Sequence, residues 1–148
     1  MLLYGLISFL IILIDQISKI LISTAFSANT RHILIPGIIN IVYRKNTGAA
    51  FSILSDHVML LGIISTVFCI GVIVFFLKKK PSNPVLCTAL SLIFAGALGN
   101  GLDRIFRGYV IDFIETAFIN FPVFNIADIS ITIGAIVLVI YVMFLEKD

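Results

Sequence analysis

The sequence is poor in charged residues. Only 12% of its 148 residues are Asp, Glu, Lys or Arg, and 60% are hydrophobic, whereas soluble domains carry about 25% charged residues. A chain of this size cannot bury so much apolar surface in a soluble core, so we predict an integral membrane protein. The net charge of +2 is too small and too scattered to indicate a nucleic-acid partner.

Cysteine and histidine are also scarce. The two cysteines, Cys69 and Cys87, lie inside apolar runs, which argues against a disulfide framework or a CxxC metal site. The two histidines, His32 and His57, stand outside any HExxH pattern, which argues against a zinc protease. We therefore expect neither a metal nor an organic cofactor.

Long apolar runs dominate what is present. They predict four membrane spans, at residues 2–24, 58–77, 85–103 and 128–145. The first run has no basic segment before it and further apolar runs after it, which favours a retained span over a cleaved signal peptide. The fold class is therefore an all-α membrane protein, and we expect one integral membrane domain over 1–148.

The segment at residues 28–57, between the first two spans, is more polar. It contains a Pro36-Gly37 turn between two β-rich pieces, 32–35 and 38–43. Such a pattern is typical of a short hairpin. We predict a small β-rich element at the extracytoplasmic face.

The expected orientation rests on three consecutive lysines, residues 78–80, in a very short loop. The positive-inside rule places this loop in the cytoplasm, which puts both termini there as well. Polar residues scattered along the sequence then gather at the extracytoplasmic face: Asp15, Asn46, Asp103, Asp112 and Asp128.

Two groups of polar residues sit on single helix faces. Asp15 and Lys19 are four residues apart and can pair, either as an interfacial salt bridge or as the wall of a polar site. Asn100, Asp103 and Arg104 share a face at the end of the third span, which predicts a cap with an ion pair between Asp103 and Arg104. The planar fork of Arg104 also suits a carboxylate or a lipid phosphate.

Two carboxylates have contrasting surroundings. Asn125 stands three residues before Asp128, a pattern typical of a helix N-cap, and the helix dipole favours an ionised Asp128. Asp112 is flanked by apolar residues, which favour its protonated form. The cap alone suffices to explain Asp128, but such a pair also suits acid and base catalysis.

Taken together, several motifs resemble the lipoprotein signal peptidase family, also called signal peptidase II. They are Asp-Gln-Ile-Ser-Lys at 15–19, Asn-Thr-Gly-Ala-Ala-Phe-Ser at 46–52, Gly-Asn-Gly-Leu-Asp-Arg at 99–104, Val-Ile-Asp-Phe at 110–113 and Phe-Asn-Ile-Ala-Asp at 124–128. Their order and spacing match the family along nearly the whole chain.

The resemblance implies a bacterial inner-membrane aspartyl endopeptidase. It would remove signal peptides from diacylglyceryl-modified prolipoproteins by cutting just before the lipidated cysteine, with Asp112 and Asp128 as the catalytic pair. The residues implied to bind substrate or order the site are Asn46, Gly48, Asn100, Asp103, Arg104 and Asn125, supported by Asp15 and Lys19. The implied partners are prolipoprotein signal peptides and membrane phospholipids, and we expect a monomer.

The residues leave two other functions open. Asp15, Lys19 and Asp112 could form an ion or proton path in a small transporter or channel. Alternatively, the protein could be a structural membrane subunit whose aspartates are replaceable caps. Without the resemblance, the enzyme and the transporter would rank nearly equal.

Overall fold

The computed structural model describes residues 1–28, 30–48 and 57–145. The helices of this part are α1 (Leu2–Ala25), α2 (Val58–Lys79), α3 (Pro84–Phe106) and α4 (Ile126–Ile140), which continues into a π-helical turn, η2 (Tyr141–Leu145). Within these described residues, four helices are long and apolar enough to cross a membrane, the last of them counted to Leu145. The predicted all-α membrane fold is therefore confirmed.

Helix α3 is the central helix of the bundle. It packs against α1, α2 and α4, and it is the most buried of the four spans. Its buried face carries small residues, among them Ala89, Ala95, Gly96 and Gly99. Small side chains let helix backbones approach closely, which drives helix association where lipid removes the hydrophobic effect.

The closest approach lies between α3 and α4. A Cβ atom added at Gly96 would stand 2.3 Å from the carbonyl oxygen of Ala127 and 2.6 Å from the Ile131 side chain. From the other helix, a Cβ at Gly134 would meet the Ala89 carbonyl oxygen at 2.8 Å. The contact between these helices therefore depends on glycine from both sides.

Replacing Gly96 by alanine is expected to destabilise the fold by about 1–3 kcal/mol, because the methyl group would push the first turn of α4 away. The matched control is Gly5→Ala in α1, where a Cβ meets nothing within 4 Å; there the better helix propensity of alanine is expected to keep or raise stability. Thermal unfolding in detergent measures both. Equal stability of the two variants would contradict the close contact.

A three-stranded antiparallel sheet has the order β1-β2-β3, with β1 (Arg31–Ile35), β2 (Ile39–Asn46) and β3 (Val110–Thr116). The predicted hairpin is confirmed, and Gly37 takes a left-handed φ of +72° in its turn. The third strand was not predicted. It comes from the connection between α3 and α4, so the sheet joins two segments that are distant in the sequence.

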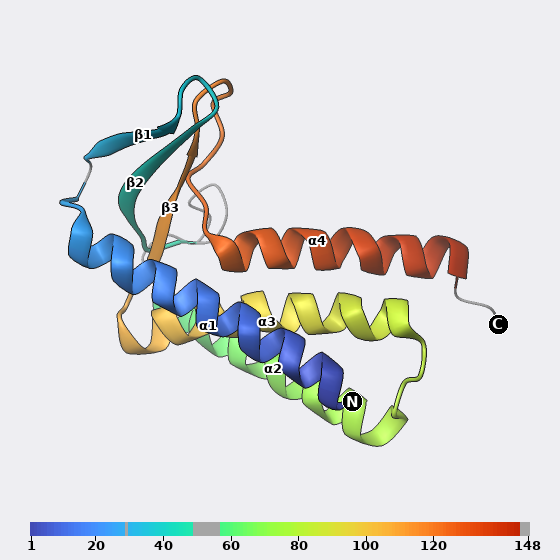
Figure 1. The fold of residues 1–148 in the computed structure, drawn as a ribbon. Coiled ribbons are helices and arrows are strands. Elements are labelled where there is room, and N and C mark those ends of the chain that lie inside the picture. The colour runs from blue at the N-terminus through green and yellow to red at the C-terminus, as the bar shows by residue number, and fades with distance from the viewer. Residues whose placement is uncertain (29, 49–56, 146–148) are drawn as a thin grey trace.

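The sheet lies at the end of the bundle where α1 and α3 finish and α4 begins, away from the start of α1 and the end of α4 (Figure 1). It is held to α1 by an apolar cluster of Tyr43, Ile111 and Phe113, against which Ile22 and Phe26 pack. This cluster fixes β3 above the helix ends, and β3 carries Asp112.

Candidate active site

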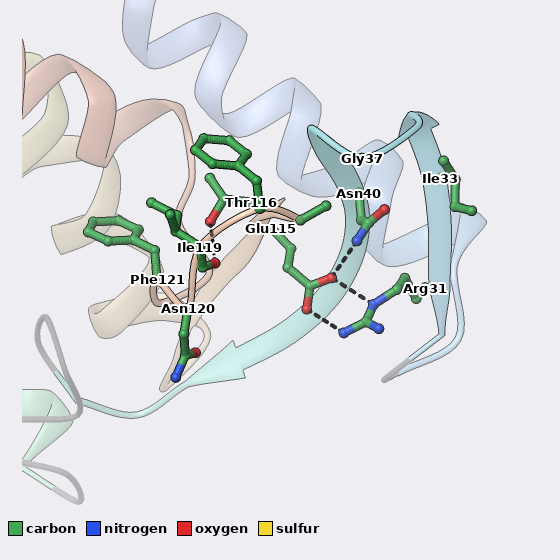
Figure 2. Close-up of a pocket in the computed structure, with 11 residues that line it drawn as sticks. Arg31, Ile33, Gly37, Asn40, Glu115, Thr116, Ile119, Asn120 and Phe121 are labelled. Atoms are coloured by element: carbon green, nitrogen blue, oxygen red, sulfur yellow. Dashed lines mark hydrogen bonds and ion pairs between the residues drawn. The ribbon is translucent and has the colours of Figure 1, made fainter.

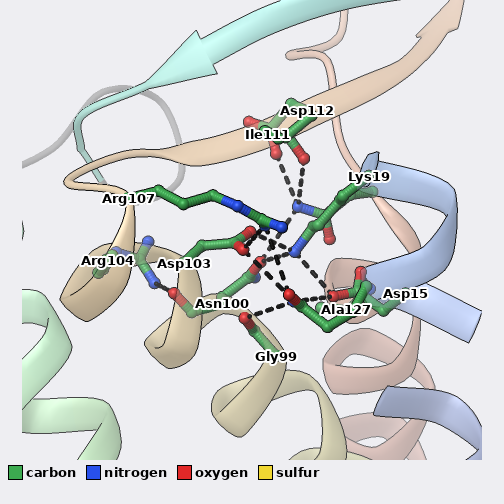
Figure 3. A network of polar contacts seen from close by, with 12 residues as sticks. Asp15, Lys19, Gly99, Asn100, Asp103, Arg104, Arg107, Ile111, Asp112 and Ala127 are labelled. Atoms are coloured by element: carbon green, nitrogen blue, oxygen red, sulfur yellow. Dashed lines mark hydrogen bonds and ion pairs between the residues drawn. The ribbon is translucent and has the colours of Figure 1, made fainter. Parts of the chain in front are cut away.

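A buried polar network fills the junction between the sheet and the helix ends (Figure 3). It collects side chains from α1, α3, β2, β3 and α4. The sequence-predicted residues in it are Asp15, Lys19, Asn46, Gly48, Asn100, Asp103, Arg104, Asp112, Asn125 and Asp128. Segments far apart in the chain thus meet in one layer.

Asn125 connects the two candidate catalytic carboxylates. Its side-chain oxygen accepts a hydrogen bond from the Asp128 backbone N–H at 2.9 Å, and the Asp128 carboxylate accepts one from the Asn125 backbone N–H at 3.1 Å. The predicted N-cap is thereby confirmed, as a reciprocal capping box. The Asn125 amide nitrogen is left free to donate to Asp112 Oδ1, at 2.7 Å.

Asp112 is buried on β3 between two amides. Asn46 donates to its Oδ2 at 2.8 Å, and Asn125 donates to its Oδ1. Burial and the negative charge of nearby Asp128 raise the pKa of Asp112 to about 7, against the opposing effect of the two amide hydrogen bonds. Asp112 can therefore carry a proton near neutral pH.

Asn46 is itself oriented by the chain that follows it. The Gly48 backbone N–H donates to the Asn46 side-chain oxygen at 2.8 Å, so the Asn46 amide nitrogen faces Asp112. Arg104 in turn donates to the Gly48 carbonyl oxygen at 3.0 Å. This end of β2 is thus tied to α3 beside the carboxylates.

Asn100 links Asp128 to a buried lysine. Its side-chain oxygen accepts from Lys19 Nζ at 2.9 Å and from Asn125 at 3.1 Å, while its amide nitrogen donates to Asp128 Oδ1 at 2.8 Å. An ammonium group can only donate, so Lys19 fixes which end of the Asn100 amide faces Asp128.

Lys19 is fully buried and lies 2.8 Å from carboxylate oxygens of both Asp15 and Asp103. The pairing of Asp15 with Lys19 is therefore present, and it forms a wall of the polar site. The other Asp15 oxygen accepts the Ala127 backbone N–H at 3.0 Å. Through Asp15, α1 holds the first turn of α4 in place.

The predicted ion pair between Asp103 and Arg104 is wrong. Asp103 pairs with Lys19 and with Arg107, one helical turn further on. Arg104 instead donates to the carbonyl oxygens of Gly48 and Asn100. Adjacent helix residues point about 100° apart, so a residue four positions away reaches Asp103 better than its neighbour does.

Two residues of the network were missed by sequence reasoning. Arg107 pairs with Asp103, and the i,i+4 spacing of these two residues was a signal that could have found it. Gln16 donates to the Gly99 carbonyl oxygen at 3.2 Å and to Asp103 at 3.4 Å. No local pattern in the sequence connects Gln16 to α3.

Among the described residues, no group of three or more His, Cys, Asp or Glu side chains is arranged to hold a metal ion. The carboxylates of the network accept hydrogen bonds from amides and backbone N–H groups, or pair with Lys19 and Arg107. The arrangement suits acid and base catalysis by a pair of carboxylates.

A cavity of about 670 Å³ lies at the end of the sheet away from the carboxylate pair (Figure 2). There Arg31 Nε lies 2.7 Å from Glu115 Oε2, and Asn40 donates to the same oxygen at 2.9 Å. The hydrogen bond from Arg31 lowers the pKa of Glu115, so this carboxylate is ionised at neutral pH. The lining contains neither Asp112 nor Asp128, so this cavity is separate from the carboxylate pair.

Comparison with solved structures gives the class of protein first. Two structures described as bacterial membrane enzymes match this chain. One has a TM-score of 0.89 at 37% identity and covers 98% of this chain and 92% of that one. The other has a TM-score of 0.87 at 39% identity and covers 97% and 94%. The chain thus has the fold of a bacterial membrane enzyme.

Sequence comparison gives the family. The family model described as signal peptidase (SPase) II matches residues 7–144. A lipoprotein signal peptidase of Staphylococcus aureus strain JH9 is 41% identical over 137 residues, which is 91% of this chain and 84% of the relative. The chain belongs to the signal peptidase II family of aspartyl proteases. The resemblance seen in the sequence is confirmed, and an enzyme is favoured over a transporter or a structural subunit.

Proposed function

We propose that this enzyme cleaves diacylglyceryl-modified prolipoproteins just before the lipidated cysteine, with Asp112 and Asp128 as the catalytic pair. The observation that carries the proposal is the bridge through Asn125, which hydrogen bonds to both carboxylates from one residue. These hydrogen bonds hold the two carboxylates close to one residue, although two ionised carboxylates would repel each other. Family membership supports the substrate class.

In the proposed mechanism the pair holds one proton, carried by Asp112, whose pKa lies near 7. Ionised Asp128 takes a proton from water, and the water oxygen bonds to the scissile carbonyl carbon. Asp112 donates its proton to the carbonyl oxygen, which gives a neutral tetrahedral diol. Asp128 then protonates the leaving nitrogen and Asp112 takes back the diol proton as the C–N bond breaks. The products are a signal peptide that ends in a carboxylic acid, which loses its proton to water, and the free amine of the lipidated cysteine.

The location of the pair suits such a substrate. Both carboxylates lie where apolar helices meet a sheet, so a signal-peptide helix and the lipid chains can lie against the bundle while water enters from the sheet side. We place this end at the extracytoplasmic face of the bacterial inner membrane, and residues 78–80 with both termini in the cytoplasm. The protein acts as a monomer in this proposal.

The test uses purified enzyme in nanodiscs and two prolipoprotein peptides that differ only in the diacylglyceryl group on the cysteine. We expect the lipidated peptide to be cleaved and the unmodified one to remain intact, with mass spectrometry placing the cut at the bond preceding the cysteine. Equal cleavage of both peptides, or a cut elsewhere, would overturn the proposed substrate class.

The pH dependence of cleavage is expected to report on Asp112. Because the proposed mechanism needs a protonated Asp112, kcat/KM is expected to fall as the pH rises above about 7. The hydrogen bond from Asn46 stabilises ionised Asp112, so Asn46→Ala is expected to raise the pKa and move this decline to higher pH. A pH–rate profile measures the shift.

The control for this profile is Asn40→Ala. Asn40 lies on the same strand but donates to Glu115. Its replacement is expected to leave the profile in place. If the decline in kcat/KM of Asn46→Ala occurs at the same pH as in the unchanged enzyme, or at lower pH, the role given to the Asn46 amide is contradicted.

A further inference from the structure

An apolar groove lies between α2 and α3. It is next to the connection that joins these two helices, which lies at the end of the bundle opposite the sheet (Figure 1). Its volume is about 380 Å³, within the range of small-molecule sites. The groove is lined by Phe68, Gly71, Val72, Phe75, Leu86 and Leu90. A Cβ atom at Gly71 would meet nothing within 4 Å, so glycine leaves this part of the groove open.

The groove runs directly toward a cluster of lysines. On α2, Lys78 and Lys79 follow Phe75 by three and four residues, so they continue the helix face that lines the groove. Both lysines are exposed, as is Lys80 at the helix C-cap. Within the described part of the chain, no ion pair involves any of them.

The acidic residues of the described segments all lie at the other end of the molecule. They belong to the buried network or to the Arg31 ion pair. The lysine cluster is therefore an exposed patch of positive charge, and no described side chain neutralises it. Beside an apolar groove in a membrane span, such charge fits an amphiphile with a negatively charged head.

We propose that this groove and the lysine cluster bind an anionic phospholipid. One acyl chain lies along Phe75, Gly71 and Phe68, and the phosphate lies at Lys78 and Lys79. Phe75 follows Phe68 by seven positions on the helix, which is a rise of about 10 Å at 1.5 Å per residue. That length stays within one leaflet of a hydrocarbon core about 30 Å thick, so the head and the chain match the two parts of the site.

The experiment measures retained phosphatidylglycerol and phosphatidylcholine by native mass spectrometry, after the full chain has been equilibrated with an equal mixture of the two. We expect the unchanged protein to retain phosphatidylglycerol selectively. Replacing one lysine, in Lys79→Gln, is expected to weaken phosphatidylglycerol retention about fivefold. Filling the groove, in Gly71→Leu, is expected to remove the retained lipid although every lysine remains.

Each variant has a matched control. Gly5→Leu adds the same side chain to a span glycine that also has open space around it, and Arg44→Gln removes one exposed positive charge at the sheet end. Both are expected to retain phosphatidylglycerol as the unchanged protein does.

Three results would overturn the proposal. Equal retention of the two lipids would remove the role of charge. Loss of selectivity in Lys79→Gln with Gly71→Leu unaffected would mean that the lysines act as surface charge without the groove. A change of oligomeric mass in Gly71→Leu would identify the groove as a contact for a second copy of the chain.

Discussion

Asp112→Asn and Asp128→Asn are each expected to lower prolipoprotein cleavage by at least about 10³-fold, because an amide can neither take nor give the proton at the reacting atoms. The change keeps the size and shape of the side chain. At Asp112 the hydrogen bonds from Asn46 and Asn125 can be kept only in part, since a carboxamide has one acceptor oxygen instead of two. Cleavage of a lipidated peptide in nanodiscs, with stability checked by thermal unfolding, measures the effect.

The control for this prediction is Glu115→Gln, which makes the same chemical change on the same strand as Asp112. Glu115 pairs with Arg31 at the far cavity, where the exposed arginine limits the energy of the pair. Cleavage is expected to stay near that of the unchanged enzyme. Folded Asp112→Asn and Asp128→Asn variants that cleave at full rate would rule out the carboxylate pair as the catalytic centre.

The largest expected loss of stability comes from Lys19→Met. The methionine fills a similar volume, but it leaves the buried carboxylates of Asp15 and Asp103 without their shared partner. Removing one partner of a buried pair costs about 3–5 kcal/mol. We expect the free energy of unfolding to fall by about this amount, with loss of cleavage because Asn100 is no longer oriented toward Asp128.

Lys45→Met is the matched control for this change. Lys45 is exposed and its ammonium lies 4.6 Å from the centre of the Tyr109 ring, a contact worth less than about 1 kcal/mol at the surface. Chemical denaturation in mixed micelles compares the two variants. Similar losses in both would mean that Lys19 contributes no more than a surface lysine.

The features that the sequence predicted correctly follow local rules. The Pro36-Gly37 turn needs a residue that accepts positive φ, and Gly37 has it. The cap at Asn125 needs a short polar side chain three residues before an acidic one, and the capping box is there. The spans follow from length and hydropathy alone. Each of these signals lies within one stretch of the chain.

The features that escaped prediction depend on contacts between distant segments. Strand β3 has a mixed pattern of polar and apolar residues, and it becomes a strand because β2, a distant segment of the chain, pairs with it, with Arg44 opposite Asp112. Likewise, Asp103 is neutralised by Lys19 from another helix in addition to Arg107 on its own. Tertiary packing decides the pairing with Lys19, so local spacing could not reveal it, whereas the i,i+4 spacing of Arg107 could have.

The capping box at the start of α4 has a consequence for how the enzyme reaches its reactive state. Asp128 is held before any substrate arrives: its carboxylate accepts the Asn125 backbone N–H at the cap of its own helix and the Asn100 amide from α3. The hydrogen-bond donors around Asp128 are therefore in place once α4 packs against α3, and in the proposed mechanism they need little rearrangement in each catalytic cycle. We therefore expect any rearrangement on substrate entry to occur in other parts of the site, with the Asp128 carboxylate held in place.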